Sequence, residues 1–184
     1  MKVVGFAGFS NSGKTTLITW IVRRLKEEGA RVGVVKHTPH GFDVGNNDTG
    51  RIFNAGADVV IASSEMGLLR MERSERADSL SDILNELKDV EFVLVEGYKS
   101  NSLPKIVVYG NQLTPEDLKL LEDGDVMGVV IPDIDKIHSI KEKSKGLEIK
   151  GGINGDIKIV IDGNREIPVF AFKDERIVDF LKNN

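Results

Sequence analysis

The sequence predicts an α/β fold of three layers, built on a mostly parallel sheet and followed by a C-terminal β-hairpin. Short apolar runs that are typical of buried strands alternate with amphipathic segments along most of the chain. Strands that alternate with helices in this way usually pair in parallel. The tail breaks the alternation, because its apolar runs at 157–161 and 166–172 flank an Asp-Gly pair, which is typical of a hairpin turn.

The other elements are predicted from the same patterns. The helix at residues 14–28 carries apolar side chains on one face and stops at Gly29. No element is predicted for residues 133–155, which are charged and contain glycine, and residues 132–166 are interpreted as an insertion that includes the hairpin. The remaining predictions are strands at 2–7, 31–36, 57–62, 68–71, 91–95, 106–109 and 126–131, and helices at 48–56, 79–87, from 114 onward, and at 175–182.

The length and composition of the chain limit the number of domains and the kinds of partner and metal site that we expect. A chain of 184 residues fits one domain, so residues 1–184 are predicted to fold as a single unit. The 25 basic and 29 acidic side chains give a net charge of -4, which gives no global reason to expect a nucleic-acid partner. Cysteine is absent, which excludes disulfides and thiolate metal sites. No signal-peptide pattern and no apolar run of about 18 residues occur, so we expect a cytoplasmic protein without a membrane partner.

Residues 8–15 have the spacing G-x-x-x-x-G-K-T, which is typical of a loop that binds phosphates. Gly8 and Gly13 allow the backbone to turn its N–H groups toward a polyphosphate at close range. Lys14 is expected to contact the β- and γ-phosphates, and the Thr15 hydroxyl is expected to ligate magnesium. A strand precedes the loop and an amphipathic helix follows it, as this motif requires. The sequence therefore predicts a P-loop NTPase fold that binds a nucleoside triphosphate with Mg²⁺.

A magnesium–nucleotide site also needs a carboxylate at the end of a neighbouring strand. Glu96 follows the apolar strand at 91–95 and is the best placed, although a solvated glutamate at a strand end is the alternative. Gly97 would then allow the backbone to approach the γ-phosphate. Asp48 is a second metal candidate, but it is equally suited to cap a helix.

The sequence gives a weaker signal for the residues that contact the nucleotide base. The chain lacks an Asn-Lys-x-Asp guanine signature. Asp133 follows the strand at 126–131, where a residue that contacts the base is expected, and a helix or turn cap is the alternative interpretation. His37 and His40 are three residues apart, but without a further clear ligand they do not predict a transition-metal site.

Five segments together resemble the MobB family of molybdopterin-guanine dinucleotide biosynthesis adapter proteins. The resemblance extends over about residues 1–109, and its segments are GFSNSGKTTL, VVKHTPHGFD, NDTGRIFNAGAD, FVLVEGYK and PKIVV. It implies a homodimeric GTP-binding protein, at most a slow GTPase, that assists the guanylyltransferase which attaches GMP to molybdopterin. The chain departs from the family pattern at Tyr109-Gly110, where an arginine is expected, and in a longer segment at 136–165.

The resemblance also implies roles for individual residues. GTP and Mg²⁺ would be bound by Gly8, Ser10, Asn11, Ser12, Gly13, Lys14, Thr15, Thr16 and Glu96. A functional face for the anionic substrate or partner would be lined by His37, Asp48, Arg51, Lys99 and Lys105.

Two other functions share the same phosphate loop. The first is a small-molecule kinase, which would need an arginine-rich lid, and Arg70, Arg73 and Arg76 form the only arginine cluster in the sequence. A solvated surface explains that cluster equally well. The second is a nucleotide-binding scaffold that does not hydrolyse its ligand.

Overall fold

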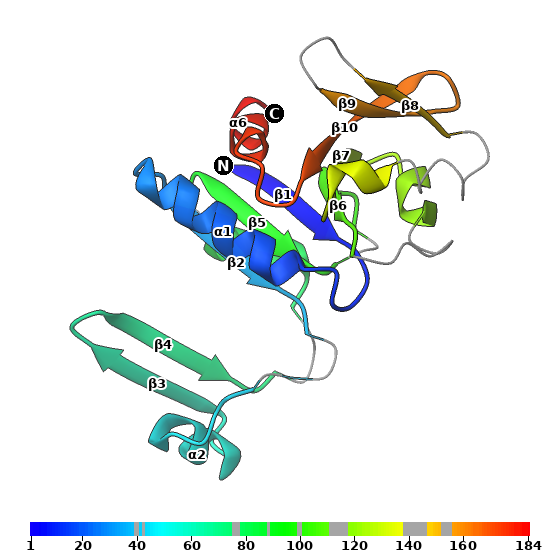
Figure 1. Cartoon of the computed structure of the whole chain (residues 1–184). Coiled ribbons are helices and arrows are strands. Elements are labelled where there is room, and N and C mark those ends of the chain that lie inside the picture. The colour runs from blue at the N-terminus through cyan, green and yellow to red at the C-terminus, as the bar shows by residue number, and fades with distance from the viewer. Residues whose placement is uncertain are drawn as a thin grey trace. The chain divides into compact units, whose positions relative to one another are not determined.

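The computed structural model describes residues 1–38, 41, 43–74, 78–87, 89–98, 101–110, 118–137, 147–151 and 156–184. It divides into two compact units, Met1–His37 with Leu87–Asn184 and Thr38–Glu86, and each unit is described by itself (Figure 1). Whether residues 1–184 behave as one domain stays a prediction. No helix among the described residues is long and apolar enough to cross a membrane.

The larger unit contains a sheet of eight strands in the order β2-β5-β1-β6-β7-β10-β9-β8. Neighbours from β2 to β10 pair in parallel, and the last two pairs are antiparallel. The predicted α/β class with a mostly parallel sheet is therefore confirmed. The strands are β1 (Lys2–Ala7), β2 (Val32–Lys36), β5 (Phe92–Glu96), β6 (Lys105–Val108), β7 (Val126–Ile131), β8 (Leu147–Gly151), β9 (Ile157–Ile161) and β10 (Arg165–Ala171).

Apolar side chains cover both faces of this sheet because successive residues of a strand point to opposite sides. Along β6, Ile106 belongs to the core cluster that contains helices α1 (Lys14–Glu27) and α6 (Arg176–Asn183), whereas Val107 belongs to the cluster on the other face. The α1 side of the core includes the fully buried Leu17, Ile21 and Leu25. The opposite cluster includes side chains around the short 3₁₀ helices η1 (Leu120–Glu122) and η2 (Ile134–Lys136).

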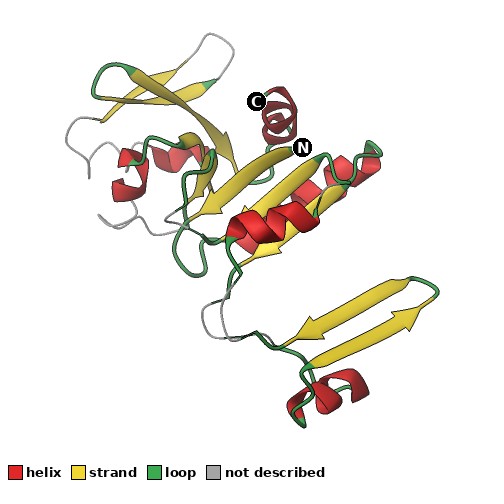
Figure 2. Ribbon diagram, turned by 180° about the vertical axis from the view of Figure 1, so that it is seen from behind, coloured by secondary structure: helices red, strands yellow, loops and turns green. Residues whose placement is uncertain are grey.

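The smaller unit contains helices α2 (Asp48–Asn54) and α3 (Leu80–Glu86) and a hairpin of β3 (Val59–Ser64) and β4 (Gly67–Glu72). Figure 2 shows this hairpin as a sheet of its own. The expectation of parallel pairing was wrong for these two strands, because two strands joined by a two-residue turn pair antiparallel. Asn47, not Asp48, caps α2, since the Asn47 side-chain oxygen accepts the Gly50 N–H at 2.9 Å.

The tail hairpin is confirmed. Asp162 and Gly163 have φ of 51° and 73°, the left-handed conformations that a tight hairpin turn requires. Strand β8 was missed, because its alternation of apolar and charged residues extends over only Leu147 to Lys150, and it pairs antiparallel with β9. The helix predicted to start at residue 114 lies outside the described residues.

Lys105, which begins β6, is only 5% exposed. Its ammonium donates to Asp123 Oδ2 at 2.6 Å and to the Asn101 carbonyl oxygen at 3.2 Å. The hydrogen bond from Lys105, with help from the backbone N–H of Asp125, holds the pKa of Asp123 below its ordinary value. Lys105 therefore forms an ion pair inside the fold and is not presented on the functional face that was predicted to include it.

We expect Asp123→Asn to lower the free energy of unfolding by about 2 kcal/mol, because it leaves a buried ammonium without its counter-charge. The cost falls below that of a fully buried pair, since the Asp123 side chain is 36% exposed. Because the native pKa is lowered, this contribution is complete above the ordinary aspartate pKa of 3.8 and is lost as the pH falls through the lowered value. Urea unfolding from pH 7 to pH 3 checks this, and Asp125→Asn is the matched control.

Candidate functional site

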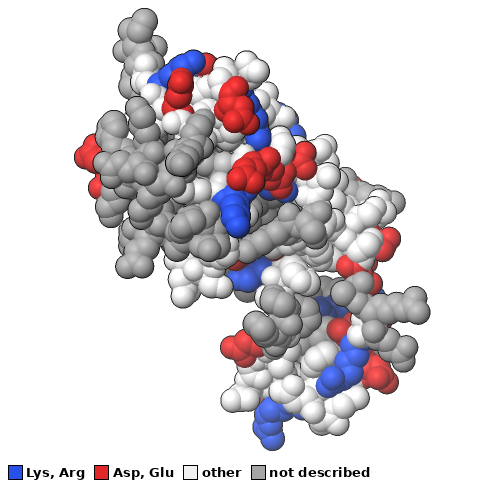
Figure 3. Space-filling model, turned by 90° about the vertical axis from the view of Figure 1, so that its right-hand side faces the viewer, with Lys and Arg blue, Asp and Glu red and all other residues white. Residues whose placement is uncertain are grey.

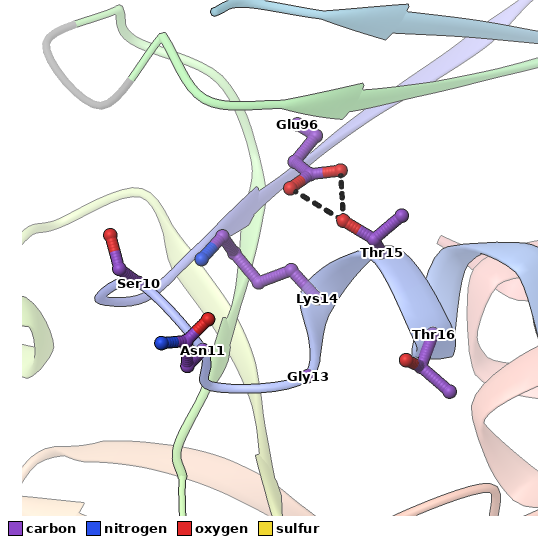
Figure 4. A pocket seen from close by; sticks show the side chains of 7 residues that line it. All are labelled: Ser10, Asn11, Gly13, Lys14, Thr15, Thr16 and Glu96. Carbon is purple, nitrogen blue, oxygen red and sulfur yellow. Dashed lines mark hydrogen bonds between the residues drawn. The ribbon is translucent and has the colours of Figure 1, made fainter.

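The phosphate loop joins β1 to α1 through a curved backbone (Figure 4). Gly8, Asn11 and Gly13 have φ of 153°, 62° and 92°, the region that favours glycine. A Cβ on Gly8 would collide with the Val108 carbonyl oxygen and lie 2.8 Å from Ser12 Oγ. A Cβ on Gly13 would lie 3.1 Å from the Phe172 ring. The two glycines of the motif are thus required by a loop packed closely on β6 and on the end of β10.

Helix α1 begins at this loop without a side-chain cap. Its N-cap is Gly13, and no acidic residue occurs in its first turn, although the structure describes every residue of α1. By contrast, α2 has both the Asn47 cap and Asp48 in its first turn. The first N–H groups of a helix have no partner within it, and its dipole favours an anion there. The start of α1 therefore suits a phosphate.

The Lys14 side chain folds back over the loop. Its ammonium donates to the carbonyl oxygens of Phe9 at 2.7 Å and Gly8 at 3.1 Å, and to Ser12 Oγ at 3.4 Å. Ser12 is 7% exposed, so its hydroxyl lies inside the loop. These contacts hold the Lys14 ammonium over the loop, where the motif needs a cation.

Three side chains from different elements meet at one place: Thr15 of α1, Glu96 of β5 and Lys36 of β2. The Thr15 hydroxyl donates toward both carboxylate oxygens of Glu96, at 2.9 Å each, as Figure 4 shows. The Lys36 ammonium lies 3.2 Å from Thr15 Oγ1 and 3.4 Å from Glu96 Oε2. Lys36 was not predicted as a site residue, although its strand-end position was a signal: in the register of β2 on β5 it is the partner of Glu96.

This arrangement fits a magnesium ion. Mg²⁺ prefers oxygen ligands and is usually held by one or two protein groups together with substrate phosphates and water. The Thr15 hydroxyl and the Glu96 carboxylate supply such oxygens. The Lys36 ammonium, a cation, already lies beside both of these groups. Among the described residues no group of three or more His, Cys, Asp and Glu forms an all-protein metal site. A metal at Thr15 and Glu96 would need the phosphates to complete its coordination.

The loop, the start of α1 and Glu96 surround a hollow of about 520 Å³. Its lining residues are Ser10, Asn11, Gly13, Lys14, Thr15, Thr16 and Glu96. Seven of the residues predicted from the motif and the resemblance are thus brought together in one cavity.

Other candidates at the strand ends have structural contacts. Gly97 has φ of 96°, and a Cβ there would lie 2.9 Å from His37 Cβ, so it allows the ends of β2 and β5 to approach. The His37 ring lies 5.0 Å from the ring of Tyr98. Asp133 Oδ1 accepts the Asp135 N–H at 3.1 Å and caps η2, which is the alternative considered for it.

The remaining candidates belong to the smaller unit or lie outside the described residues. Asp48 and Arg51 are 94% and 74% exposed and form an ion pair at 3.5 Å on α2. Arg70 pairs with Glu72 at 2.6 Å, and Arg73 lies on the Phe53 ring and bonds its carbonyl oxygen. His40, Arg76 and Lys99 lie outside the described residues.

The surface drawn in Figure 3 mixes acidic and basic side chains, apart from the atoms drawn in grey. Positive charge is not gathered into one broad patch on that face. This mixture of charges agrees with the net charge of -4.

Comparison with known proteins supports the resemblance. The family model described as MobB, molybdopterin guanine dinucleotide synthesis protein B, matches residues 3–132. A probable molybdopterin-guanine dinucleotide biosynthesis adapter protein of Bacillus subtilis is 32% identical over 133 residues, covering 70% of this chain and 75% of the relative. The adapter protein of Escherichia coli is 32% identical over 126 residues, covering 64% of this chain and 72% of the relative.

Solved structures agree with this assignment. The crystal structure of Bacillus subtilis MobB superimposes with a TM-score of 0.69 at 26% identity, covering 100% of this chain and 97% of that one. A crystal structure of molybdopterin-guanine biosynthesis protein B gives a TM-score of 0.65, again at 26% identity, with 98% of both chains covered. Since the family model spans well over half of the sequence, the chain belongs to the MobB family.

Proposed function

We propose that this protein binds GTP with Mg²⁺ and serves as a cytoplasmic accessory protein in molybdenum cofactor biosynthesis, where it assists the guanylyltransferase that attaches GMP to molybdopterin. The observation that carries the proposal is the meeting of an uncapped helix start, Lys14 and the Thr15–Glu96 pair around one hollow. The names of the relatives supply the pathway.

Charge compensation supports a triphosphate as the ligand. The loop offers Lys14 and the dipole of α1, and Lys36 adds a second cation beside Thr15. Against these, Glu96 is the single acidic residue among the described residues that line the hollow. Magnesium, when bound, would neutralise charge on the terminal phosphates.

The same residues support slow hydrolysis at most. A fast GTPase needs a group that orients the attacking water. Among the described residues that line the hollow, the ionisable groups are Lys14 and Glu96, and the Glu96 carboxylate is engaged by Thr15 and Lys36. Arg70 and Arg73 are bound within their own unit, so no observation favours the kinase alternative. A single-turnover assay separates slow hydrolysis from a scaffold without turnover.

We expect Lys14→Ala to weaken GTP binding about a hundredfold, because two charge-assisted contacts to the terminal phosphates are lost. Calorimetry with GTP and ATP measures this, and the wild-type protein should bind GTP more tightly than ATP. Lys26→Ala, on the last turn of the same helix, serves as the control and should bind like wild type. Equal affinity of wild type for GTP and ATP would remove the guanine part of the proposal.

Glu96→Gln is expected to reduce the dependence of GTP binding on magnesium. The neutral amide keeps the shape of the side chain but removes the negative charge that attracts Mg²⁺. The dissociation constant for GTP is measured in Mg²⁺ and in EDTA, and the ratio of the two should fall about tenfold in the variant. Glu91→Gln, just before β5 at its opposite end, should leave the ratio unchanged. An unchanged ratio in Glu96→Gln contradicts the assignment of Glu96 to the metal.

We also propose that two copies of the chain associate through the β3–β4 hairpin. A two-stranded sheet is marginally stable by itself in water, and exposed strand edges invite pairing. Apolar side chains stand exposed on this hairpin: Val59 at 43%, Ile61 at 58%, Leu68 at 69% and Leu69 at 51%. Val59 and Ile61 alternate along β3 with the buried Val60, so they form the uncovered face. A second copy would bury that face, as the homodimer implied by the resemblance requires.

A lysine at this face should break the association. Light scattering of wild type is expected to give twice the chain mass of 20.3 kDa, whereas Ile61→Lys should give the mass of one chain at the same concentration. Glu65→Lys at the turn of the hairpin changes charge without removing apolar surface and serves as the control. A wild-type mass of one chain at working concentration contradicts the dimer.

A further inference from the structure

A second hollow, of about 290 Å³, adjoins the phosphate site along α1. It shares the lining residues Thr15 and Thr16 with the first hollow, so both hollows border the start of the helix. In Figure 4 the Thr16 side chain points away from the phosphate loop, whereas that of Thr15 points toward Glu96. The remaining lining residues are Thr19, Trp20, Arg23 and Lys173.

The chemistry of this hollow differs from that of the phosphate site. Trp20 is partly buried against the core and offers a fixed aromatic surface. Arg23 and Lys173 are exposed, and within the described part of the chain neither pairs with an acidic side chain. None of the described residues that line the hollow carries a carboxylate. An aromatic ring with two cationic donors suits a planar heterocycle whose edge carries hydrogen-bond acceptors.

Lys173 is held in a strained conformation at this place. Its φ of 62° lies in the left-handed region, which is unusual for a residue other than glycine, asparagine or aspartate. The turn is fixed by the hydrogen bond of the Asp174 N–H to the Ala171 carbonyl oxygen at 3.1 Å and by the ion pair of Asp174 with Arg176 at 2.6 Å. Strain of this kind is concentrated at functional sites. Phe172, one residue earlier, packs on Gly13 and so ties this turn to the phosphate loop.

We infer that this hollow receives the nucleoside of the bound triphosphate, with the purine base against Trp20 and its acceptor edge toward Arg23 and Lys173. The inference rests on the proposed function, because it takes the triphosphate to lie in the loop. Thr16 lines both hollows. A triphosphate whose terminal phosphates lie at Lys14 would therefore pass Thr16 and place its nucleoside in the second hollow. The base is thus assigned to residues other than Asp133, whose carboxylate caps η2.

The same donors give a reason to prefer guanine. The N7 and O6 atoms of guanine are adjacent acceptors, to which arginine or lysine can donate together. Adenine has an amino donor in place of O6, which a cation repels. Arg23 and Lys173 would therefore discriminate between the two bases.

The test compares ligands with and without a nucleoside. Calorimetry is performed with GTP, ATP and inorganic tripolyphosphate on the full chain with Mg²⁺. Arg23→Met and Lys173→Gly are each expected to weaken GTP binding about tenfold and to bring it near that of ATP, with tripolyphosphate unchanged. Trp20→Leu should weaken both GTP and ATP and leave tripolyphosphate unchanged, because stacking on an aromatic ring does not distinguish the two purines. Arg31→Met, an exposed arginine outside both hollows, is the matched control.

Two further readouts guard against a folding defect. Lys173→Gly relieves the left-handed φ and should melt at the same temperature as wild type or higher. Trp20 is the one tryptophan of the chain, so GTP should change the intrinsic fluorescence of the protein and tripolyphosphate should not.

The failures are distinguishable. GTP binding that leaves the fluorescence and all three variants like wild type overturns this inference and leaves the proposed function intact. Variants that weaken tripolyphosphate as much as GTP show that the hollow extends the phosphate site, which also overturns it. If wild type binds neither GTP nor tripolyphosphate, the proposed function itself is wrong.

Discussion

The close packing of the phosphate loop against β6 is the constraint on which the site depends. The parallel register of β1 on β6 brings Gly8 so near the Val108 carbonyl oxygen that no side chain fits between them. Farther along, the backbone of Ser12 approaches Gly110, where a Cβ would lie 3.5 Å from Ser12 Cα. Within the loop the Ser12 N–H donates to the Phe9 carbonyl oxygen at 3.3 Å, so a turn inside the loop helps to keep its curvature. The curvature that the proposed phosphate site needs is therefore set by the packing of the loop on the sheet.

The protein as a whole is negatively charged, whereas the phosphate site is rich in positive charge. The chain carries -4 overall, yet Lys14, Lys36 and the start of α1 gather positive potential around one carboxylate, Glu96. That carboxylate is 12% exposed, so the loss of solvation makes a nearby cation favourable. Lys36 meets this need through a flexible stem, and its side chain is 48% exposed.

Local signals predicted some parts of the molecule well and others poorly. The phosphate loop was readable because its chemistry lies in eight consecutive residues, and α1 because its apolar face repeats at helical spacing. Lys36 was missed since its proximity to Glu96 depends on the register of β2 on β5, which no short pattern encodes. The strands β3 and β4 were predicted, but their separation into a sheet of their own was not, because their composition resembles that of buried strands. Lys105 was expected on a surface, but burial of its ammonium depends on Asp123, which follows a loop elsewhere in the chain.

The tail of the chain also contributes to the site. The family model ends at residue 132, whereas β10 begins at Arg165 and still completes the parallel part of the sheet beside β7. Parallel strands present their carboxyl ends at one edge, so the turn after β10 emerges next to the turn after β1. There Phe172 packs on Gly13, and Lys173 lines the second hollow, which lies beside Thr15 and Thr16. The antiparallel strands β8 and β9 extend the sheet beyond β10, so they shield the far edge of the strand that carries this turn. Residues more than 150 positions after the phosphate loop thus limit how the loop can move and what can lie beside it.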